Sequence, residues 1–195
     1  MKIGLFFGSF NPVHIGHLAI ANYMVEFTDL QQLWFVISPH NPLKPKQSLL
    51  ADYHRRMLME MAVETDPRYR VSDIEFSMPQ PSYTIDTLAW LKEKHPGHTF
   101  VILMGSDGLP AFNKWKNYRL IEEEYQRYIY PRPGYPVNAS EHKNILQVDA
   151  PLMEISSSFI REAISNGKNI RNFLPPKVYE YIEEMHFYKD IRTKE

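Results

Sequence analysis

The sequence of 195 residues contains no cysteine. This absence excludes disulfide bonds, zinc sites built from thiolates and catalysis by a cysteine nucleophile. A chain without cysteine also fits a reducing compartment, and we therefore expect a cytoplasmic protein.

Long apolar runs are missing as well. The first ten residues, MKIGLFFGSF, contain too short an apolar stretch for a signal peptide. No segment approaches the roughly 20 apolar residues that span a membrane. We therefore expect no membrane partner.

Neither sign of charge is in excess, because 22 Lys and Arg nearly balance 23 Asp and Glu and give a formal net charge of -1. A protein that binds nucleic acid through a broad field carries a basic excess, so we expect no nucleic-acid partner. Any polyanion that the chain binds must instead be bound by a local cluster of basic residues. The length predicts a single domain over residues 1–195 and leaves open whether the chain forms a homo-oligomer.

Short apolar stretches alternate with helical patterns along the chain. The stretches typical of strands are residues 3–7, 33–38, 69–76, 99–107, 126–136 and 144–151. The helical patterns cover the segment that contains Leu18, Ala21 and Val25, and then residues 53–65, 84–95, 157–167 and 175–188. This alternation predicts an α/β fold, a Rossmann-like doubly wound parallel sheet with C-terminal helices.

The stretch GSFNPVHIGHL, residues 8–18, follows the first predicted strand and leads into a helix. Ligands bind at the carboxyl ends of strands in such sheets, and a helix start offers free N–H groups to an anion. Gly8 permits a turn with close backbone approach, while His14 and His17 are three apart and share a helix face. Alternatively, one histidine caps the helix and the other packs in the core.

A second strand-to-helix junction, ISSSFIR, covers residues 155–161. Its serines can cap a helix, and Arg161 can grip a phosphate with two hydrogen bonds. Ordinary helix capping explains the same residues equally well.

GSFNPVHIGH resembles the GxFxPxHxGH signature of the nucleotidyltransferase superfamily, and ISSSFIR resembles its ISSTxIR partner. HIGH also resembles class I aminoacyl-tRNA synthetases, but the chain lacks a KMSKS-like segment and room for tRNA-recognition domains. The greatest resemblance is to the bacterial nicotinate-nucleotide adenylyltransferase family. It extends over most of the chain through SPHNPLK (38–44), PSYTIDTL (81–88), MGSD (104–107), Trp115, PRPG (131–134), ISSSFIR and LPPKVYEYIEEMHFY.

The resemblance implies a fold of the nucleotidyltransferase type and adenylyl transfer from ATP to nicotinate mononucleotide. The products would be deamido-NAD, made in NAD biosynthesis, and pyrophosphate. Mg²⁺ is expected to arrive with ATP, since the sequence shows no set of metal ligands.

The resemblance also implies roles for individual residues. The expected catalytic residues are His14, His17, Lys44 and Arg161. The ATP-binding residues would be these two histidines and Arg161 together with Gly8, Ser9, Phe10, Gly105, Asp107, Ser157, Phe159 and Ile160. The acceptor would be bound by Ser9, Lys44, Tyr83, Thr84, Asp107 and Trp115.

Four residues depart from the family pattern, namely Phe7, Asn11, Leu43 and Met78. These departures bear on the preference between nicotinate mononucleotide and nicotinamide mononucleotide more than on the activity itself. Two other functions remain open: adenylyl transfer to another phosphomonoester such as phosphopantetheine, and nucleotide binding by a regulator without turnover. Structural explanations also remain for the SYT segment, as a helix cap, and for Trp115, as a core anchor.

Overall fold

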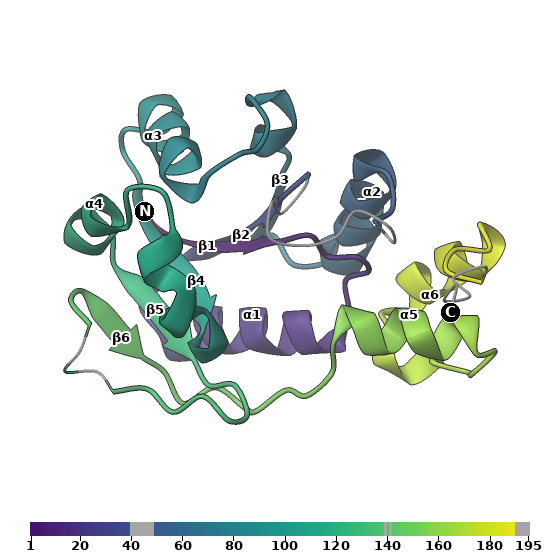
Figure 1. Cartoon of the computed structure of the whole chain (residues 1–195). Helices are drawn as coiled ribbons and strands as arrows, with labels where there is room; N and C mark the ends of the chain where they lie inside the picture. Colours follow the sequence, from purple (N-terminus) through teal and green to yellow (C-terminus); the bar gives the residue numbers. More distant parts are fainter. Residues whose placement is uncertain (40–48, 139, 141, 190–195) are drawn as a thin grey trace.

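Six parallel strands form one sheet in the order β3-β2-β1-β4-β5-β6 (Figure 1). The computed structural model describes residues 1–39, 49–138, 140 and 142–189. The strands are β1 (Lys2–Gly8), β2 (Gln32–Ile37), β3 (Tyr69–Ser72), β4 (Thr99–Gly105), β5 (Arg127–Tyr130) and β6 (Ile145–Gln147). All neighbouring strands run parallel, which confirms the predicted doubly wound α/β fold.

Helices connect the strands. The α-helices are α1 (Ile15–Phe27), α2 (Asp52–Val63), α3 (Thr84–Lys94), α4 (Tyr118–Glu124), α5 (Ser157–Ser165) and α6 (Pro176–Glu184). Among the described residues, 3-10 helices include η1 (Ile74–Ser77), η2 (Ser106–Lys114) and η4 (Arg171–Phe173). The five predicted helices are confirmed, whereas η2, η4 and α4 were not predicted. The strand predicted over residues 69–76 ends at Ser72, and its last part belongs to η1 instead.

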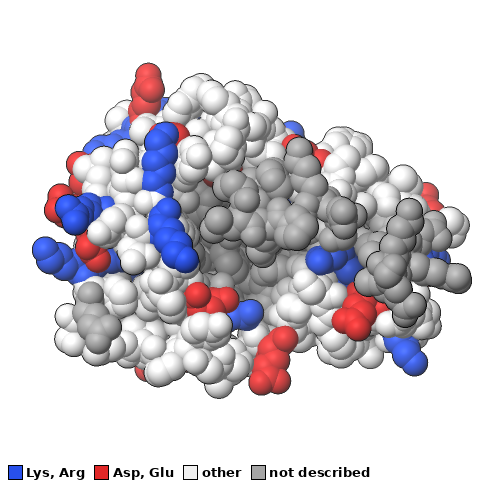
Figure 2. Space-filling view, in the orientation of Figure 1, with Lys and Arg blue, Asp and Glu red and all other residues white. Residues whose placement is uncertain are grey.

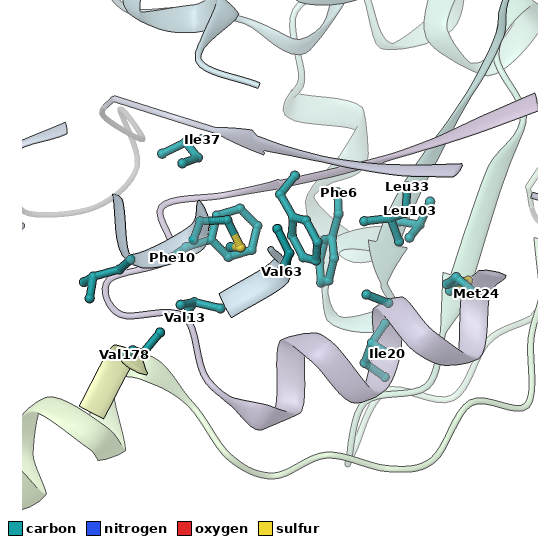
Figure 3. Close-up of a cluster of buried hydrophobic side chains, with 14 of the residues drawn as sticks. Phe6, Phe10, Val13, Ile20, Met24, Leu33, Ile37, Val63, Leu103 and Val178 are labelled. Atoms are coloured by element: carbon teal, nitrogen blue, oxygen red, sulfur yellow. The ribbon is translucent and has the colours of Figure 1, made fainter. Parts of the chain in front are cut away.

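Alternate strand residues point to two apolar cores, one on each face of the sheet. In β2, Phe35 and Ile37 join the core under α1, α2, α5 and α6, while Trp34 and Val36 join the core under α3 and α4. Figure 3 shows the first core, with Phe6 of β1 pointing toward Ile20 of α1. Helices therefore cover both faces of the sheet, as its apolar strands require.

The buried face of α1 differs from the predicted one. Ile20, Ala21 and Met24 are buried, whereas Leu18 and Val25 are only half-buried at the edge of the core. Apolar side chains lie nearly all round this helix, so the sequence spacing could not identify the inner face.

Charges of both signs are interspersed over the face drawn in Figure 2. This distribution agrees with the near-zero net charge of the sequence. No helix within the described part of the chain has the length and apolar character needed to cross a membrane.

The sheet changes winding direction between β1 and β4. From β1 the chain adds β2 and β3 on one side, then crosses back to add β4, β5 and β6 on the other. Connections leave in opposite directions at such a point and open a crevice beyond the strand ends. Here those ends are Gly8 and Gly105.

Candidate active site

A cavity of about 380 Å³ lies at this change of direction. Its walls come from the end of β1, the end of β4, the start of α3 and the end of η2. Of the residues predicted for the site it includes Gly8, Ser9, Gly105, Tyr83, Thr84 and Trp115. The structure thus joins the loop after β1 to the predicted acceptor residues.

The loop after β1 folds tightly around Gly8. A side chain at Gly8 would meet the ring of Phe10 at 2.9 Å, a distance that real Cβ atoms do not adopt. Phe10 has a φ of +44° and is buried, with its ring at right angles to that of Phe6. Phe10 therefore supports the loop by packing its side chain into the core.

His14 and His17 lie together at the start of α1. Their rings stack with centroids 3.7 Å apart, and the backbone N–H of His14 donates to Nδ1 of His17 at 3.2 Å. Because this Nδ1 accepts, the ring proton of a neutral His17 is assigned to Nε2. Gly16 leaves room for the His14 ring, since a Cβ there would lie 3.0 Å from Nδ1 of His14.

Burial controls the charge of His14, which is only 4% exposed. Loss of water, followed by the positive charge of Arg132, lowers its pKa to about 4. The ring is therefore neutral at pH 7. Its Nδ1 atom is buried without a hydrogen-bond partner among the described residues, and His14 does not line the cavity.

Asp107 begins the turn beyond β4, and its side chain is 46% exposed. Gly105 makes room for it, since a Cβ at Gly105 would lie under 3.0 Å from Oδ1 of Asp107. Nε of Arg132 lies 3.7 Å from Oδ2 of the same carboxylate. Sequence reasoning gave Arg132 no role, although its position two residues after the end of β5 places it at this edge of the sheet.

The start of α5 is tied to the loop after β1. The N-cap hydroxyl of Ser156 accepts from the N–H of Phe159, and the hydroxyl of Ser157 donates to the carbonyl of Pro12 at 2.8 Å. Arg161 donates from Nη1 to the carbonyl of Asn11 at 2.8 Å and from Nη2 to Ser158. The two predicted phosphate motifs therefore form one structural unit.

Two of the predicted ATP residues have different surroundings. Phe159 is 45% exposed and packs its ring edge on Phe173. Ile160 is fully buried in the core, and its N–H donates to the carbonyl of Ser156. The structure thus gives the Ile160 side chain a packing role rather than a place in the cavity.

The far wall of the cavity belongs to α3 and the end of η2. Tyr83 is the N-cap of α3, so the first N–H groups and the positive end of its dipole lie at this wall. Lys116 places Nζ 4.8 Å from the centre of the Tyr83 ring and 2.8 Å from Asp86. Trp115 is half-buried and tilts against Phe112.

Glu75, which sequence reasoning missed, is 3% exposed and also lines the cavity. Its carboxylate accepts from the hydroxyls of Ser82 at 2.9 Å and Thr87 at 2.8 Å. These bonds hold the segment before α3 in place. Of the departures from the family pattern, Met78 is buried in the core beside Thr87, and Phe7 lines the cavity.

Lys44 and Leu43 lie outside the described residues. Among the residues that are described, no group of three His, Asp or Glu side chains is placed to hold a metal ion.

Similarity to known proteins extends over nearly the whole chain. The family model described as cytidylyltransferase-like matches residues 5–163. A probable nicotinate-nucleotide adenylyltransferase of Flavobacterium johnsoniae is 53% identical over 97% of this chain and 100% of its own length. The chain belongs to this family. A relative of the same description from Bacteroides fragilis is 49% identical over 93% of the chain and 90% of its own length.

Solved structures share the fold of this family member. The nicotinic acid mononucleotide adenylyltransferase of Plasmodium falciparum, complexed with NaAD, superimposes with a TM-score of 0.83. The alignment covers 96% of this chain and 97% of that one at 22% identity. At this identity the likeness establishes the nucleotidyltransferase type of fold.

Proposed function

We propose that the chain transfers the adenylyl group of ATP to nicotinate mononucleotide, with deamido-NAD and pyrophosphate as products. One observation carries the proposal: the cavity joins Gly8 and Ser9, in the loop after β1, to Tyr83, Thr84 and Trp115. A phosphate held at the loop and a ring held at the far wall would then occupy one continuous space. Membership of the adenylyltransferase family supports the same reaction.

In this reaction a phosphate oxygen of the acceptor attacks the α-phosphorus of ATP. The bond from that phosphorus to the oxygen shared with the β-phosphorus breaks, and pyrophosphate leaves. The attacking phosphate is already anionic at pH 7, so the step needs no general base. Catalysis then consists of alignment and stabilisation of charge.

Both histidines suit a donor role. His14 has its pKa lowered to about 4, so its ring is neutral at pH 7. The Nδ1 of His17 accepts from the backbone N–H of His14, which leaves the Nε2 atom of His17 to donate. We assign these N–H groups to phosphate oxygens on which charge develops, and Arg161 and Lys44 to the neutralisation of phosphate charge. Nucleotidyltransferases of this kind use a divalent metal ion with ATP; we propose Mg²⁺, which neutralises phosphate charge as part of the substrate.

The far wall favours an acid over an amide. The uncapped start of α3 and the side chains of Lys114 and Lys116 line the cavity and favour an anion. They outweigh the carboxylate of Glu75, which lines the same cavity but is held by Ser82 and Thr87, and the pairing of Lys116 with Asp86. A nicotinate carboxylate gains charge-assisted hydrogen bonds there, whereas a neutral nicotinamide gains weaker ones.

Pyrophosphate release with ATP and Mg²⁺ tests the proposal. The acceptors are nicotinate mononucleotide, nicotinamide mononucleotide and phosphopantetheine, each at the same concentration. We expect the fastest release with nicotinate mononucleotide. Release with phosphopantetheine alone would contradict the assigned acceptor, and ATP binding without release in any mixture would support a regulator instead.

A further inference from the structure

Arg55, on α2, is a fully buried cation next to the loop after β1. Its side chain is 0% exposed, and its one acidic partner, Asp52, is 41% exposed. Burial of an arginine is costly unless its N–H groups are satisfied. The hydrogen bonds of the Arg55 guanidinium show which segments of the chain it holds together.

Four backbone carbonyls accept from Arg55. Nη1 donates to Ser9 at 2.8 Å and to Ser38 at 2.8 Å. Nη2 donates to Pro39 at 3.2 Å, and Nε donates to Leu50 at 3.0 Å. The planar guanidinium thus fixes the loop after β1 against the end of β2.

The bond to Ser9 also sets the direction of the peptide groups in that loop. The carbonyl of Gly8 accepts from the N–H of Ser38 at 2.9 Å, and the carbonyl of Ser9 accepts from Arg55. In a planar trans peptide the N–H points away from the carbonyl. The N–H of Ser9 belongs to the same peptide group as the Gly8 carbonyl, and the N–H of Phe10 to the same group as the Ser9 carbonyl. These two consecutive N–H groups therefore point away from the carbonyls that Ser38 and Arg55 bind.

Consecutive N–H groups turned to one side form a concave site for an anion. Gly8 and Ser9 line the cavity, so this part of the loop lies where the proposed reaction needs a phosphate. We propose that Arg55 is a positioning residue for ATP: it holds the carbonyls of the loop so that the backbone N–H groups receive the triphosphate. This inference rests on the proposed binding of ATP at the loop.

Arg127 provides a matched control. Its side chain is also 0% exposed, and it donates to Glu122 at 3.2 Å and to the carbonyl of Lys143 at 2.6 Å. It is the first residue of β5, so it lies toward the amino ends of the parallel strands, away from the carboxyl ends of β1 and β4. Replacing it removes a buried arginine from the fold without removing a bond to the loop after β1.

The test compares Arg55→Lys, Arg55→Met and Arg127→Met. Stability is followed by urea unfolding, and the affinity for ATP with Mg²⁺ is followed by calorimetry, which needs no knowledge of the acceptor. Lysine keeps the charge but lacks the planar fork, so it cannot hold the same carbonyls. We expect Arg55→Lys to fold and to bind ATP at least tenfold more weakly, with Arg55→Met weaker still.

Arg127→Met should bind ATP within twofold of the wild-type chain. The proposal is overturned if Arg55→Lys binds ATP as the wild type does, or if Arg127→Met weakens ATP binding equally. It is also overturned if Arg55→Lys fails to fold while Arg127→Met folds, since the role of Arg55 would then be structural. A wild-type chain that binds no ATP would contradict the proposed function as well.

Discussion

At the scale of single residues, His17 has two roles that can be separated. Its Nδ1 accepts from the backbone N–H of His14, and its ring lies edge-on to Phe6 and Phe10. The first role belongs to the helix start, while the proposed role toward phosphate needs the imidazole N–H. Two substitutions at this position together separate the roles.

His17→Ala removes the imidazole, whereas a glutamine at this position can still accept from the backbone N–H of His14, as in a capping box. We expect kcat/KM for pyrophosphate release by His17→Ala to fall on the order of 10² to 10³, with a loss of about 1 kcal/mol of stability. His17→Gln should keep the stability and, because its amide also has an N–H to donate, recover part of the turnover. Near-normal turnover by His17→Ala would remove this histidine from the mechanism.

His14 makes stability depend on pH. Its pKa is about 4 in the folded chain and near 6.5 when unfolded, so between these values the unfolded state binds the extra proton. The neutral His14 therefore contributes its full share to the free energy of unfolding above about pH 6.5. This share, on the order of 3 kcal/mol, is lost as pH falls toward 4. Urea unfolding of the wild type and His14→Gln across this range measures it. Parallel profiles for the two proteins would show that His14 is not the titrating group.

At the scale of elements, helix starts hold the motifs in place. Ser156 caps α5, and its neighbour Ser157 links the same turn to the carbonyl of Pro12. Because the cap satisfies a backbone N–H that would otherwise lack a partner, its loss affects the whole helix.

Ser156→Ala should lower the free energy of unfolding by about 1 kcal/mol, whereas Ser156→Asp, which keeps a capping oxygen, should lose far less. Chemical denaturation of both variants measures the difference. Equal losses would mean that the capping bond contributes nothing.

The strands and helices were largely predictable because buried parallel strands have continuous apolar sequences. The exceptions have identifiable causes. The segment SDGLPAFNK contains Gly108 and Pro110 and reads as a loop, yet it forms η2. The seven residues of α4 are too few for a helical period to stand out.

The candidate site was predictable only where its residues belong to short local motifs. The resemblance to a family named His14, His17, Tyr83 and Trp115 from such motifs, and their catalytic and binding roles stay predictions. By contrast, the contacts of Arg55 and Arg132 depend on tertiary packing, which no local spacing reveals. Arg55 lies 46 positions from the Ser9 carbonyl that it binds.

At the scale of the whole molecule, the C-terminal part of the chain supports the loop after β1. The buried hydroxyl of Tyr188 donates to Oδ1 of Asn11 at 2.8 Å across 177 positions of sequence. The N–H of Leu50 donates to the same oxygen at 3.2 Å. Asn11 is thus a long-range link. That the chain forms one domain over residues 1–195, and where in the cell it resides, stay predictions.

Tyr188→Phe removes only this hydroxyl. We expect a loss of about 1 to 2 kcal/mol in the free energy of unfolding, because Asn11 then loses a buried donor. Tyr135→Phe serves as the control, since Tyr135 is 47% exposed and its hydroxyl lies in a solvated region. If both variants unfold at the same urea concentration as the wild type, the link carries no stability.

The most direct measurement is a competition between two acceptors in one mixture. The wild-type chain receives ATP, Mg²⁺ and equal concentrations of nicotinate mononucleotide and nicotinamide mononucleotide, and the two dinucleotide products are counted. Their ratio equals the ratio of the two kcat/KM values. We predict that deamido-NAD exceeds NAD by about tenfold or more, as an added charge-assisted hydrogen bond would give. An excess of NAD, or neither dinucleotide, would contradict the assignment of the cavity to a nicotinate acceptor.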